Sequence, residues 1–185
     1  DDVGAIYGFQ WRHWNASYAD CNTDYTNKGI DQLIKCEEML KTDPNSRRII
    51  MSTWNVEQLD SGCLPPCHIL VQWYVSCDNK LYLHFYQRSA DMFLGVPFNM
   101  ASYAVFLHLM SQRTGIPAGG VIHSIGDAHV YSEHVEAVKQ QLKNEIKSQP
   151  KILIKSKMNW EDYKIEDFTV IDYECAEKIS AKLVA

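Results

Sequence analysis

Two β-rich runs joined by a short turn lie at the centre of the chain, and they constrain the fold more than any other feature. Residues 68–77 read HILVQWYVSC and residues 80–88 read KLYLHFYQR, with Asp78-Asn79 between them. Polar turn residues between two β-rich runs are typical of a tight connection between antiparallel strands. The stretch is therefore predicted to form a β-hairpin whose first strand is largely apolar on both faces.

Helical patterns flank this hairpin. A helix is predicted at 97–114, because Pro97 opens it and Gly115 and Pro117 follow its end. It is apolar nearly all round, so it is expected to be buried. The combination of a hairpin with flanking helices predicts one α+β domain, in which a mixed sheet packs against helices. The other expected elements are helices at 30–41 and 132–147, strands at 47–55, 120–125, 152–154 and 168–171, and an irregular segment with short helical turns at 1–29.

Charge and cysteine content narrow the classes of function. The chain has 185 residues, which suits one domain, and a net charge of −5, so no overall basic field favours nucleic acid or an anionic membrane. No apolar run reaches the ~18 residues of a membrane span. An anionic ligand must then be held by local arginines. None of the six cysteines forms a Cys-x-x-Cys pair, so we expect no metal, reduced thiols and a cytoplasmic protein, with a nuclear or organellar location left open.

Cys67 differs from the other cysteines in its local sequence. Pro65 and Pro66 stiffen the backbone before it, and His68 follows it at the start of a predicted strand. A cysteine becomes a useful nucleophile when a cation or hydrogen-bond donor lies nearby. The alternative is that Cys67 is a small buried hydrophobe, which is the expectation for four other cysteines, Cys21, Cys36, Cys77 and Cys175. Spacing alone leaves both alternatives open for Cys67.

Two groups of polar residues near predicted strand ends suggest an anionic ligand with an amide-like edge. Arg47-Arg48 stand at a strand start and Arg88 at a strand end, where guanidinium groups could grip a phosphate or could simply be solvated. Asp91 and Asn99 flank a helix start. An Asn side chain offers both a donor and an acceptor, which complements uracil, although it could also only cap the helix.

A third polar group is the string GDAHVY at 126–131. His129 and Tyr131 fall two residues apart, so an extended backbone would direct both side chains the same way. Each of the two residues could equally be structural. Asp127 lies in the same string and receives no specific role.

Taken together, five strings resemble the thymidylate synthase family in their order and separation. They are YGFQWRH (7–13), DPNSRR (43–48), LPPCH (64–68), YQRSADMFLGVPFNMASY (86–103) and GDAHVY (126–131). The resemblance runs over nearly the whole chain. It implies the mixed-sheet fold of that family and identifies Cys67 as the nucleophile that attacks the pyrimidine ring of dUMP.

The resemblance also implies roles for the residues around Cys67. Tyr7 and His68 would lie beside it, Arg88 would contact the phosphate and favour the thiolate, and Asn99 would read the uracil edge. For folate binding it implies Asp91, Gly95 and Ala185. For dUMP binding it implies Arg47, Arg48, Gln87, Arg88, Ser89, Asp91, Asn99, His129 and Tyr131, with His129 and Tyr131 on the sugar hydroxyl and Arg47 and Arg48 reaching across a homodimer interface.

The implied reaction is the reductive methylation of dUMP to dTMP, with 5,10-methylenetetrahydrofolate as co-substrate and without a metal. The thiolate adds to C6, C5 attacks the one-carbon unit, and the folate then leaves and donates hydride. No membrane and no nucleic acid is required. Two alternatives stay open: a dUMP hydroxymethylase, in which water replaces hydride, and a catalytically inactive truncated homologue. Asn99 argues against a dCMP hydroxymethylase, where Asp is expected.

Departures from the family pattern concern both ends of the chain. Ala5 replaces the usual Pro, Ala176 and Glu177 stand where the family usually has His-Pro, and 180–185 replaces the usual tail. By the resemblance, 1–185 is a partial thymidylate synthase domain, about the C-terminal two-thirds, without the family's N-terminal third. The isolated chain is therefore expected to show little synthase activity, and an upstream dihydrofolate reductase, as in protozoan relatives, is an open alternative.

Overall fold

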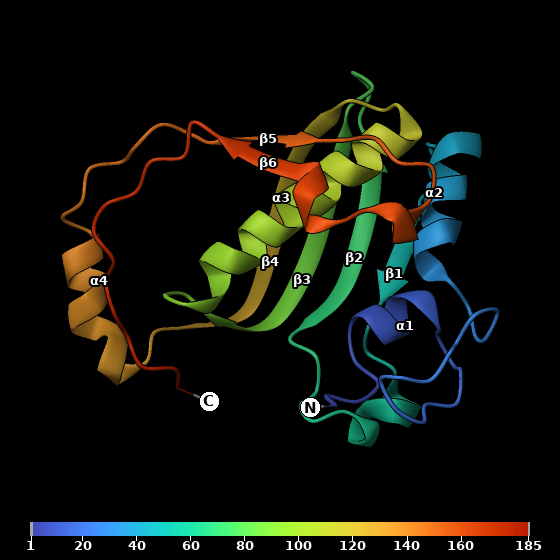
Figure 1. The fold of residues 1–185 in the computed structure, drawn as a ribbon, viewed down its shortest axis with the longest axis horizontal. Helices are drawn as coiled ribbons and strands as arrows, with labels where there is room; N and C mark the ends of the chain where they lie inside the picture. Colours follow the sequence, from blue (N-terminus) through green and yellow to red (C-terminus); the bar gives the residue numbers. More distant parts are fainter. Residues whose placement is uncertain (1, 185) are drawn as a thin grey trace.

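A computed structural model describes residues 2–184, and a four-stranded mixed sheet forms its centre (Figure 1). The strands follow the chain order β1-β2-β3-β4 across the sheet. The first three are antiparallel, and β3 and β4 are parallel. This arrangement confirms the predicted hairpin and the mixed sheet. The bounds are β1 Ile50–Ser52, β2 His68–Val75, β3 Leu81–Asp91 and β4 Ala118–His129.

Helices connect the strands and cover one face of the sheet. The parallel pair β3 and β4 is joined through α3, as parallel neighbours require a long crossover. Outside the sheet, β5 and β6 pair with each other as a separate antiparallel ribbon. The bounds are α1 Gly8–Arg12, α2 Gln32–Thr42, α3 Gly95–Thr114, α4 Val135–Gln141, β5 Lys151–Ile154 and β6 Phe168–Ile171, with short 3-10 helices at Val56–Ser61, Ser132–His134, Trp160–Asp162 and Ile165–Asp167.

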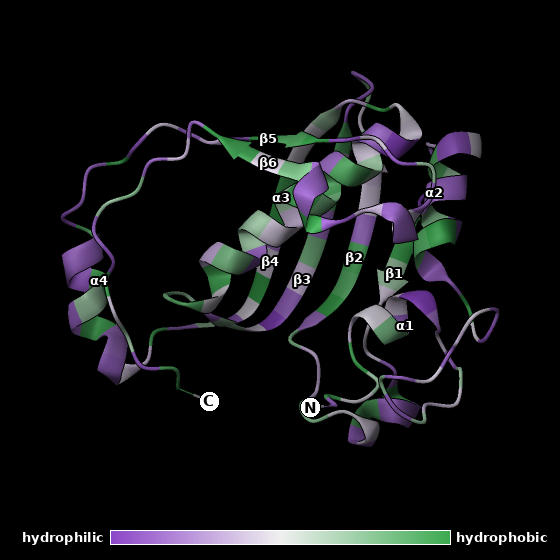
Figure 2. Cartoon of the chain, in the orientation of Figure 1, coloured by the Kyte–Doolittle hydropathy of each residue, from purple (hydrophilic) through white to green (hydrophobic). Residues whose placement is uncertain are grey.

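The core lies between the sheet and the helices α2 and α3. Alternate residues of β2 and β3, such as Val71, Trp73 and Leu83, are almost fully buried. Residues at the intervening positions of these strands, such as Tyr74 and Tyr86, point to the other face and are exposed. This alternation follows from the two-residue repeat of a strand, and Figure 2 shows polar and apolar positions interleaved along the strands. No other element within residues 2–184 therefore covers the second face of the sheet.

Helix α3 is less buried than its composition predicts. Of its residues only Tyr103, Leu107 and Met110 are buried, and Phe98 in its first turn is 74% exposed. The prediction of a fully buried helix was wrong, because α3 lies across the outer side of one sheet face and only its inner stripe meets the core. Its end is as predicted: Gly115 adopts a left-handed conformation, with φ of 74°.

Two other predicted elements are shorter than expected. The strand expected at 47–55 is only β1, because Arg47 and Arg48 lie in a turn that precedes it. The helix expected at 132–147 ends with α4 at Gln141. No residue of α4 is buried, and Figure 1 shows α4 at the end of a long connection, apart from the sheet. A helix without a packed face is short because tertiary packing supplies most helical stability.

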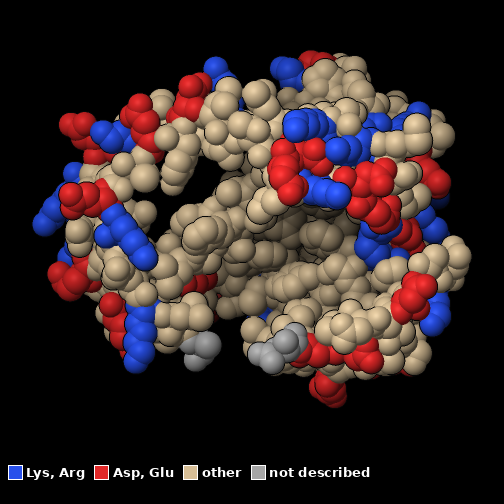
Figure 3. All heavy atoms as spheres, in the orientation of Figure 1, with Lys and Arg blue, Asp and Glu red and all other residues tan. Residues whose placement is uncertain are grey.

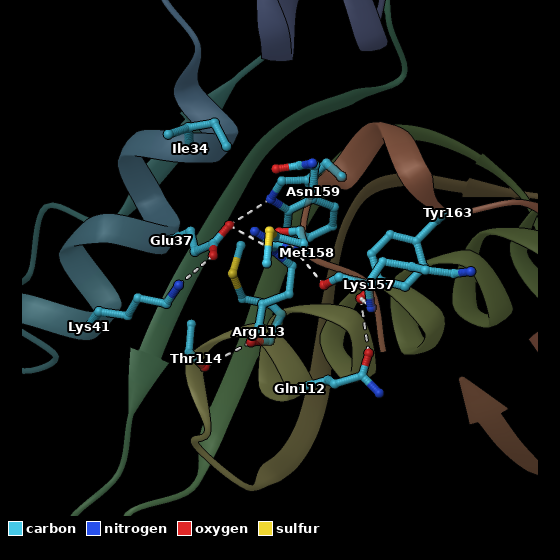
Figure 4. Close-up of polar contacts among 12 residues, drawn as sticks. Ile34, Glu37, Lys41, Gln112, Arg113, Thr114, Lys157, Met158, Asn159 and Tyr163 are labelled. Carbon is cyan, nitrogen blue, oxygen red and sulfur yellow. Dashed lines mark hydrogen bonds and ion pairs between the residues drawn. The ribbon is translucent and has the colours of Figure 1, made fainter. Parts of the chain in front are cut away.

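A buried carboxylate ties the late segment of the chain to the core (Figure 4). Glu37 of α2 is 4% exposed and accepts hydrogen bonds from Lys41 Nζ at 2.6 Å, Arg113 Nε at 2.8 Å and Trp160 Nε1 at 2.6 Å. The Arg113 guanidinium also lies over the Trp160 ring, 4.8 Å from its centroid. Burial alone would raise the pKa of Glu37, but these donors outweigh burial and hold it below its usual value.

We expect replacement of Arg113 to destabilise the fold far more than replacement of Lys41, although both contact the same carboxylate. Arg113→Met leaves Glu37 without its buried partner and should lower the free energy of unfolding by about 3 kcal/mol. Lys41 is 46% exposed, so Lys41→Met should cost less than about 1 kcal/mol. Urea denaturation at pH 7 measures both, and equal losses would contradict this account.

The same contact predicts a pH dependence. Because the pKa of Glu37 is lower in the folded than in the unfolded state, its stabilising contribution is complete above the unfolded value of 4.5 and is lost as pH falls through the folded value. Glu37→Gln should therefore lose less stability than the wild type between about pH 5 and pH 3.

Candidate active site

Arg88 holds the loop that presents Cys67. Its guanidinium donates from Nε to the carbonyl oxygen of Pro66 at 3.0 Å and from NH2 to that of Pro65 at 2.8 Å. Its backbone N–H donates to the carbonyl oxygen of Cys67 at 2.8 Å. The guanidinium also lies 5.8 Å from the centre of the Trp54 ring. A cation is therefore fixed on the two residues that precede Cys67, and Cys67 is itself half-buried rather than sealed in the core.

Tyr7 contacts Cys67 from the other side. Its hydroxyl oxygen accepts a hydrogen bond from the Cys67 backbone N–H at 2.9 Å. The backbone of Tyr7 has φ of 30°, which L-residues rarely adopt and which costs of the order of 1–3 kcal/mol. Burial raises the pKa of Tyr7, while the bond from Cys67 opposes it, so the hydroxyl stays protonated and keeps a proton to donate.

A cavity of about 310 Å³ opens next to these residues. Figure 3 shows a hollow in the face of the molecule turned toward the viewer, and mainly uncharged side chains form its walls. Two buried polar atoms in the cavity lining, Trp11 Nε1 and Tyr103 Oη, have no hydrogen-bond partner among residues 2–184. An aromatic wall with a few polar groups suits a planar heterocycle. The lining residues are Tyr7, Trp11, His68, Asn99, Ser102, Tyr103 and Phe106.

His68 begins β2 at an irregularity in the strand. His68 pairs with Gln87 and Leu70 with Tyr86, so Ile69 is an extra residue, as in a β-bulge. The His68 ring packs on Tyr103, with centroids 5.3 Å apart. Burial lowers the pKa of His68, and a hydrogen bond with Asn99 opposes that change. The ring is therefore neutral near pH 7 and can exchange a proton with a ligand.

Gln87 and Asn99 join the strand to the helix. Gln87 Nε2 donates to Asn99 Oδ1 at 3.2 Å and to the carbonyl oxygen of Ser89 at 2.9 Å, and Gln87 Oε1 faces His123 Nε2 at 2.9 Å. Gln87 is 3% exposed. A fully bonded buried amide of this kind holds its neighbours in one arrangement, so Asn99 is oriented before any ligand binds.

The remaining predicted residues of this region follow along β3, β4 and the start of α3. Asp91 pairs with His129 in the parallel ladder, and Asp91 Oδ1 accepts from the backbone N–H groups of Phe93 and Leu94. His129 Nδ1 lies 3.0 Å from Asp127 Oδ1, and its ring meets that of Tyr131 edge to face. Ser89 pairs with Asp127 two residues earlier in the same ladder. Gly95 begins α3, and a Cβ there would make ordinary contact with Asp91 and Asn99.

Close contact between β3 and β4 requires a glycine at position 126. A Cβ on Gly126 would lie 2.9 Å from the carbonyl oxygen and 3.4 Å from the Cα of Arg88. Any side chain there would displace the backbone of Arg88, and with it the guanidinium that holds the Cys67 loop. Gly126 therefore belongs to the support of the site.

Two predicted residues lie away from this centre, and one lies outside the described residues. Arg47 and Arg48 are exposed in the turn before β1, and Arg47 lines a hollow beside residues 72–77. That end of β2 is about 20 Å from His68, at ~3.3 Å per residue. Neither arginine can therefore contact the same chain's Cys67. Ala185 falls outside residues 2–184.

Comparison with known proteins places the chain in a family. A model of the thymidylate synthase family matches residues 1–185. The chain is 44% identical over 182 residues to the bifunctional dihydrofolate reductase-thymidylate synthase of Paramecium tetraurelia, covering 98% of this chain and 39% of that protein. It is 47% identical over 173 residues to the thymidylate synthase of Homo sapiens, covering 93% and 55%. For the thymidylate synthase of Saccharomyces cerevisiae the identity is 44% over 191 residues, covering 98% and 63%.

The chain belongs to the thymidylate synthase family. It spans between 39% and 63% of the length of these three relatives. The resemblance inferred from the five sequence strings is therefore confirmed at the level of the family and its fold.

The sequence argument missed several lining residues of this cavity. Ser102, Tyr103 and Phe106 follow Asn99 at helical spacings of three, four and seven, so one face of α3 forms a cavity wall. Trp11 follows Tyr7 by four residues. Both spacings are visible in the sequence and could have been used. Trp54 and His123 carried no such signal, because their contacts with Arg88 and Gln87 depend on tertiary packing and strand register.

The arrangement can bind an anion-bearing planar ligand and attack it with a thiol. A neutral imidazole, a phenol and an oriented amide line one cavity, and the loop that carries Cys67 is joined to it through the bond to Tyr7 and is anchored by Arg88. Residues 2–184 contain no group of three His, Cys, Asp or Glu side chains placed to hold a metal ion. None of the helices in this described part combines the length and apolar character of a membrane crossing.

Proposed function

We propose that this chain carries the nucleotide site of a thymidylate synthase, which converts dUMP to dTMP with 5,10-methylenetetrahydrofolate. The observation that carries the proposal is the position of Cys67. It directly follows the two prolines whose carbonyl oxygens the Arg88 guanidinium binds, its backbone N–H donates to Tyr7, and its neighbours Tyr7 and His68 line a cavity together with Asn99, in a chain of this family. The six cysteines, which form no disulfide, fit a reducing compartment such as the cytoplasm.

In this proposal Cys67 adds to C6 of the uracil ring. The sulfur–carbon bond forms as the C5–C6 double bond breaks, and its electron pair moves through C5 onto the C4 carbonyl oxygen as an enolate. Asn99 donates from its NH2 group to O4, and donors aimed at a developing oxyanion stabilise it most when they are oriented beforehand. Tyr7 and His68 lie where they can exchange protons with that edge. The folate supplies the one-carbon unit and then hydride.

Different residues are proposed to contact the phosphate and the sugar of the substrate. Arg88 and Ser89 are proposed to contact the phosphate, since guanidinium groups form paired hydrogen bonds with phosphate oxygens. His129 and Tyr131 are proposed to hold the sugar hydroxyl. Asp91, with its carboxylate capping the turn into α3, is proposed to orient nucleotide and folate together with Gly95. Gln87 positions Asn99.

We also propose that the chain acts as a homodimer through the uncovered face of the sheet. Side chains of alternating positions on all four strands are exposed there, namely Ile50, Tyr74, Tyr86 and Ile122. Exposed apolar side chains that extend across a central sheet are typical of a protein interface. A partner stacked on it would also bring its own Arg47 and Arg48 toward this chain's phosphate site, which explains why these arginines are remote from Cys67 within one chain.

The covalent step predicts a trapped complex. With 5-fluoro-dUMP and methylenetetrahydrofolate, intact mass measurement should show the chain plus nucleotide plus folate, because fluorine at C5 blocks the later steps. Cys67→Ala should abolish the adduct, and Cys77→Ala, at an exposed cysteine beyond the far end of β2, should leave it unchanged. An adduct that persists in Cys67→Ala would show that another residue is the nucleophile. Dihydrofolate formed from unmodified dUMP distinguishes the synthase from a hydroxymethylase.

The interface predicts a change in assembly. Tyr74→Glu combined with Ile122→Glu places charges on the proposed interface, so sedimentation velocity at micromolar concentration should change from dimer to monomer. Leu142→Glu is the matched control, because Leu142 is 80% exposed at the end of α4 and should leave the dimer intact. A wild-type monomer, or a dimer that survives the double substitution, would refute this interface.

A further inference from the structure

The amide of Gln87 can adopt only one orientation. Its Nε2 faces the carbonyl oxygen of Ser89 at 2.9 Å, and a carbonyl oxygen can only accept a hydrogen bond. The NH2 end must therefore lie on that side. Gln87 Oε1 then faces His123 Nε2 at 2.9 Å, so His123 must carry its proton on Nε2 and donate it.

His123 is held in place for this contact. It lies on β4 directly opposite Phe85 in the parallel ladder, and the two rings stack with centroids 4.1 Å apart at an interplanar angle of 15°. Burial lowers the pKa of His123. A neutral imidazole has one N–H group, and in His123 this group donates to Gln87.

This chain of contacts determines the orientation of Asn99. Gln87 Nε2 donates to Asn99 Oδ1 at 3.2 Å, which places the Asn99 oxygen toward Gln87 and leaves its NH2 group for the cavity. A uracil carbonyl at C4 can accept from that NH2 group, whereas the cytosine amino group at the same position cannot. The polarity of the Asn99 amide therefore distinguishes the two bases.

We propose that His123 is a positioning residue for base specificity, acting through Gln87 on Asn99 to favour uracil over cytosine. The inference rests on the proposed function of the site. His123 does not line the cavity, so its effect is on discrimination rather than on direct contact with the ligand. Losing its N–H leaves Gln87 Oε1 unpaired in a buried position, so the Gln87 amide keeps only the bonds of its NH2 end and holds Asn99 less firmly.

The test compares nucleotide affinities of the full chain by calorimetry. His123→Phe keeps a ring that stacks on Phe85 but lacks the donor, and it should reduce the ratio of dUMP to dCMP affinity by about fivefold to tenfold, as expected for one hydrogen bond. His123→Gln retains an N–H donor and should keep the ratio within about twofold of wild type. His108→Phe is the matched control, since His108 is an exposed residue on a different element, α3. The ratio of dUMP to dCMP affinity should not change in this variant.

A second measurement on the unmodified, ligand-free protein does not depend on variants that fold. Imidazole ¹⁵N chemical shifts at neutral pH should show the Nε2–H tautomer for His123. An Nδ1–H tautomer, or an unchanged affinity ratio in His123→Phe, would overturn the inference. A wild-type chain that binds neither nucleotide would instead refute the proposed function, while the tautomer still reports on the hydrogen-bond chain.

Discussion

The site depends on the attachment of the Cys67 loop to strand β3 through Arg88. One residue supplies two side-chain hydrogen bonds to the carbonyl oxygens of Pro65 and Pro66 and one backbone bond to Cys67. Two prolines in succession remove backbone donors and limit the backbone angles of this loop. Few other backbone hydrogen bonds can therefore hold the loop in place. The guanidinium is therefore the anchor of the loop that carries the thiol.

The parallel pairing of β3 and β4 brings together the motifs that lie far apart in the sequence. Asp91 on β3 meets His129 on β4, and Gln87 meets His123 across the same two strands. The first turn of α3 places Asn99 near the end of β3, where Asp91 accepts hydrogen bonds from the backbone of the turn before the helix. The glycine at 126 allows the approach of the two strands beside Arg88. Residues of two of the five strings, 86–103 and 126–131, are thus arranged by one supersecondary unit.

The sequence predicted the elements whose signals are local, and it failed where tertiary contacts decide. The hairpin at 68–88 and the end of α3 at Gly115 were correct, because turn and cap residues act within a few positions. Burial of α3 was overestimated, since composition does not show that β5, β6 and the segment between them cover its outer face only in part. Arg47 was expected in a strand, but the turn after Pro44 continues through it. Cys67 was identified from a resemblance, and His123 and Trp54 were missed, because strand register and ring packing cannot be read from one sequence.

The central claim is that the thiol of Cys67 faces the bound nucleotide, and competitive alkylation tests it directly. The protein is treated with iodoacetamide at neutral pH with and without saturating dUMP, and peptide mass analysis follows the rate at each cysteine. We predict that dUMP slows modification of Cys67 at least tenfold, roughly 1.4 kcal/mol of protection, and leaves the exposed Cys21, Cys63, Cys77 and Cys175 unaffected. An alkylation rate at Cys67 that dUMP does not change would contradict the account.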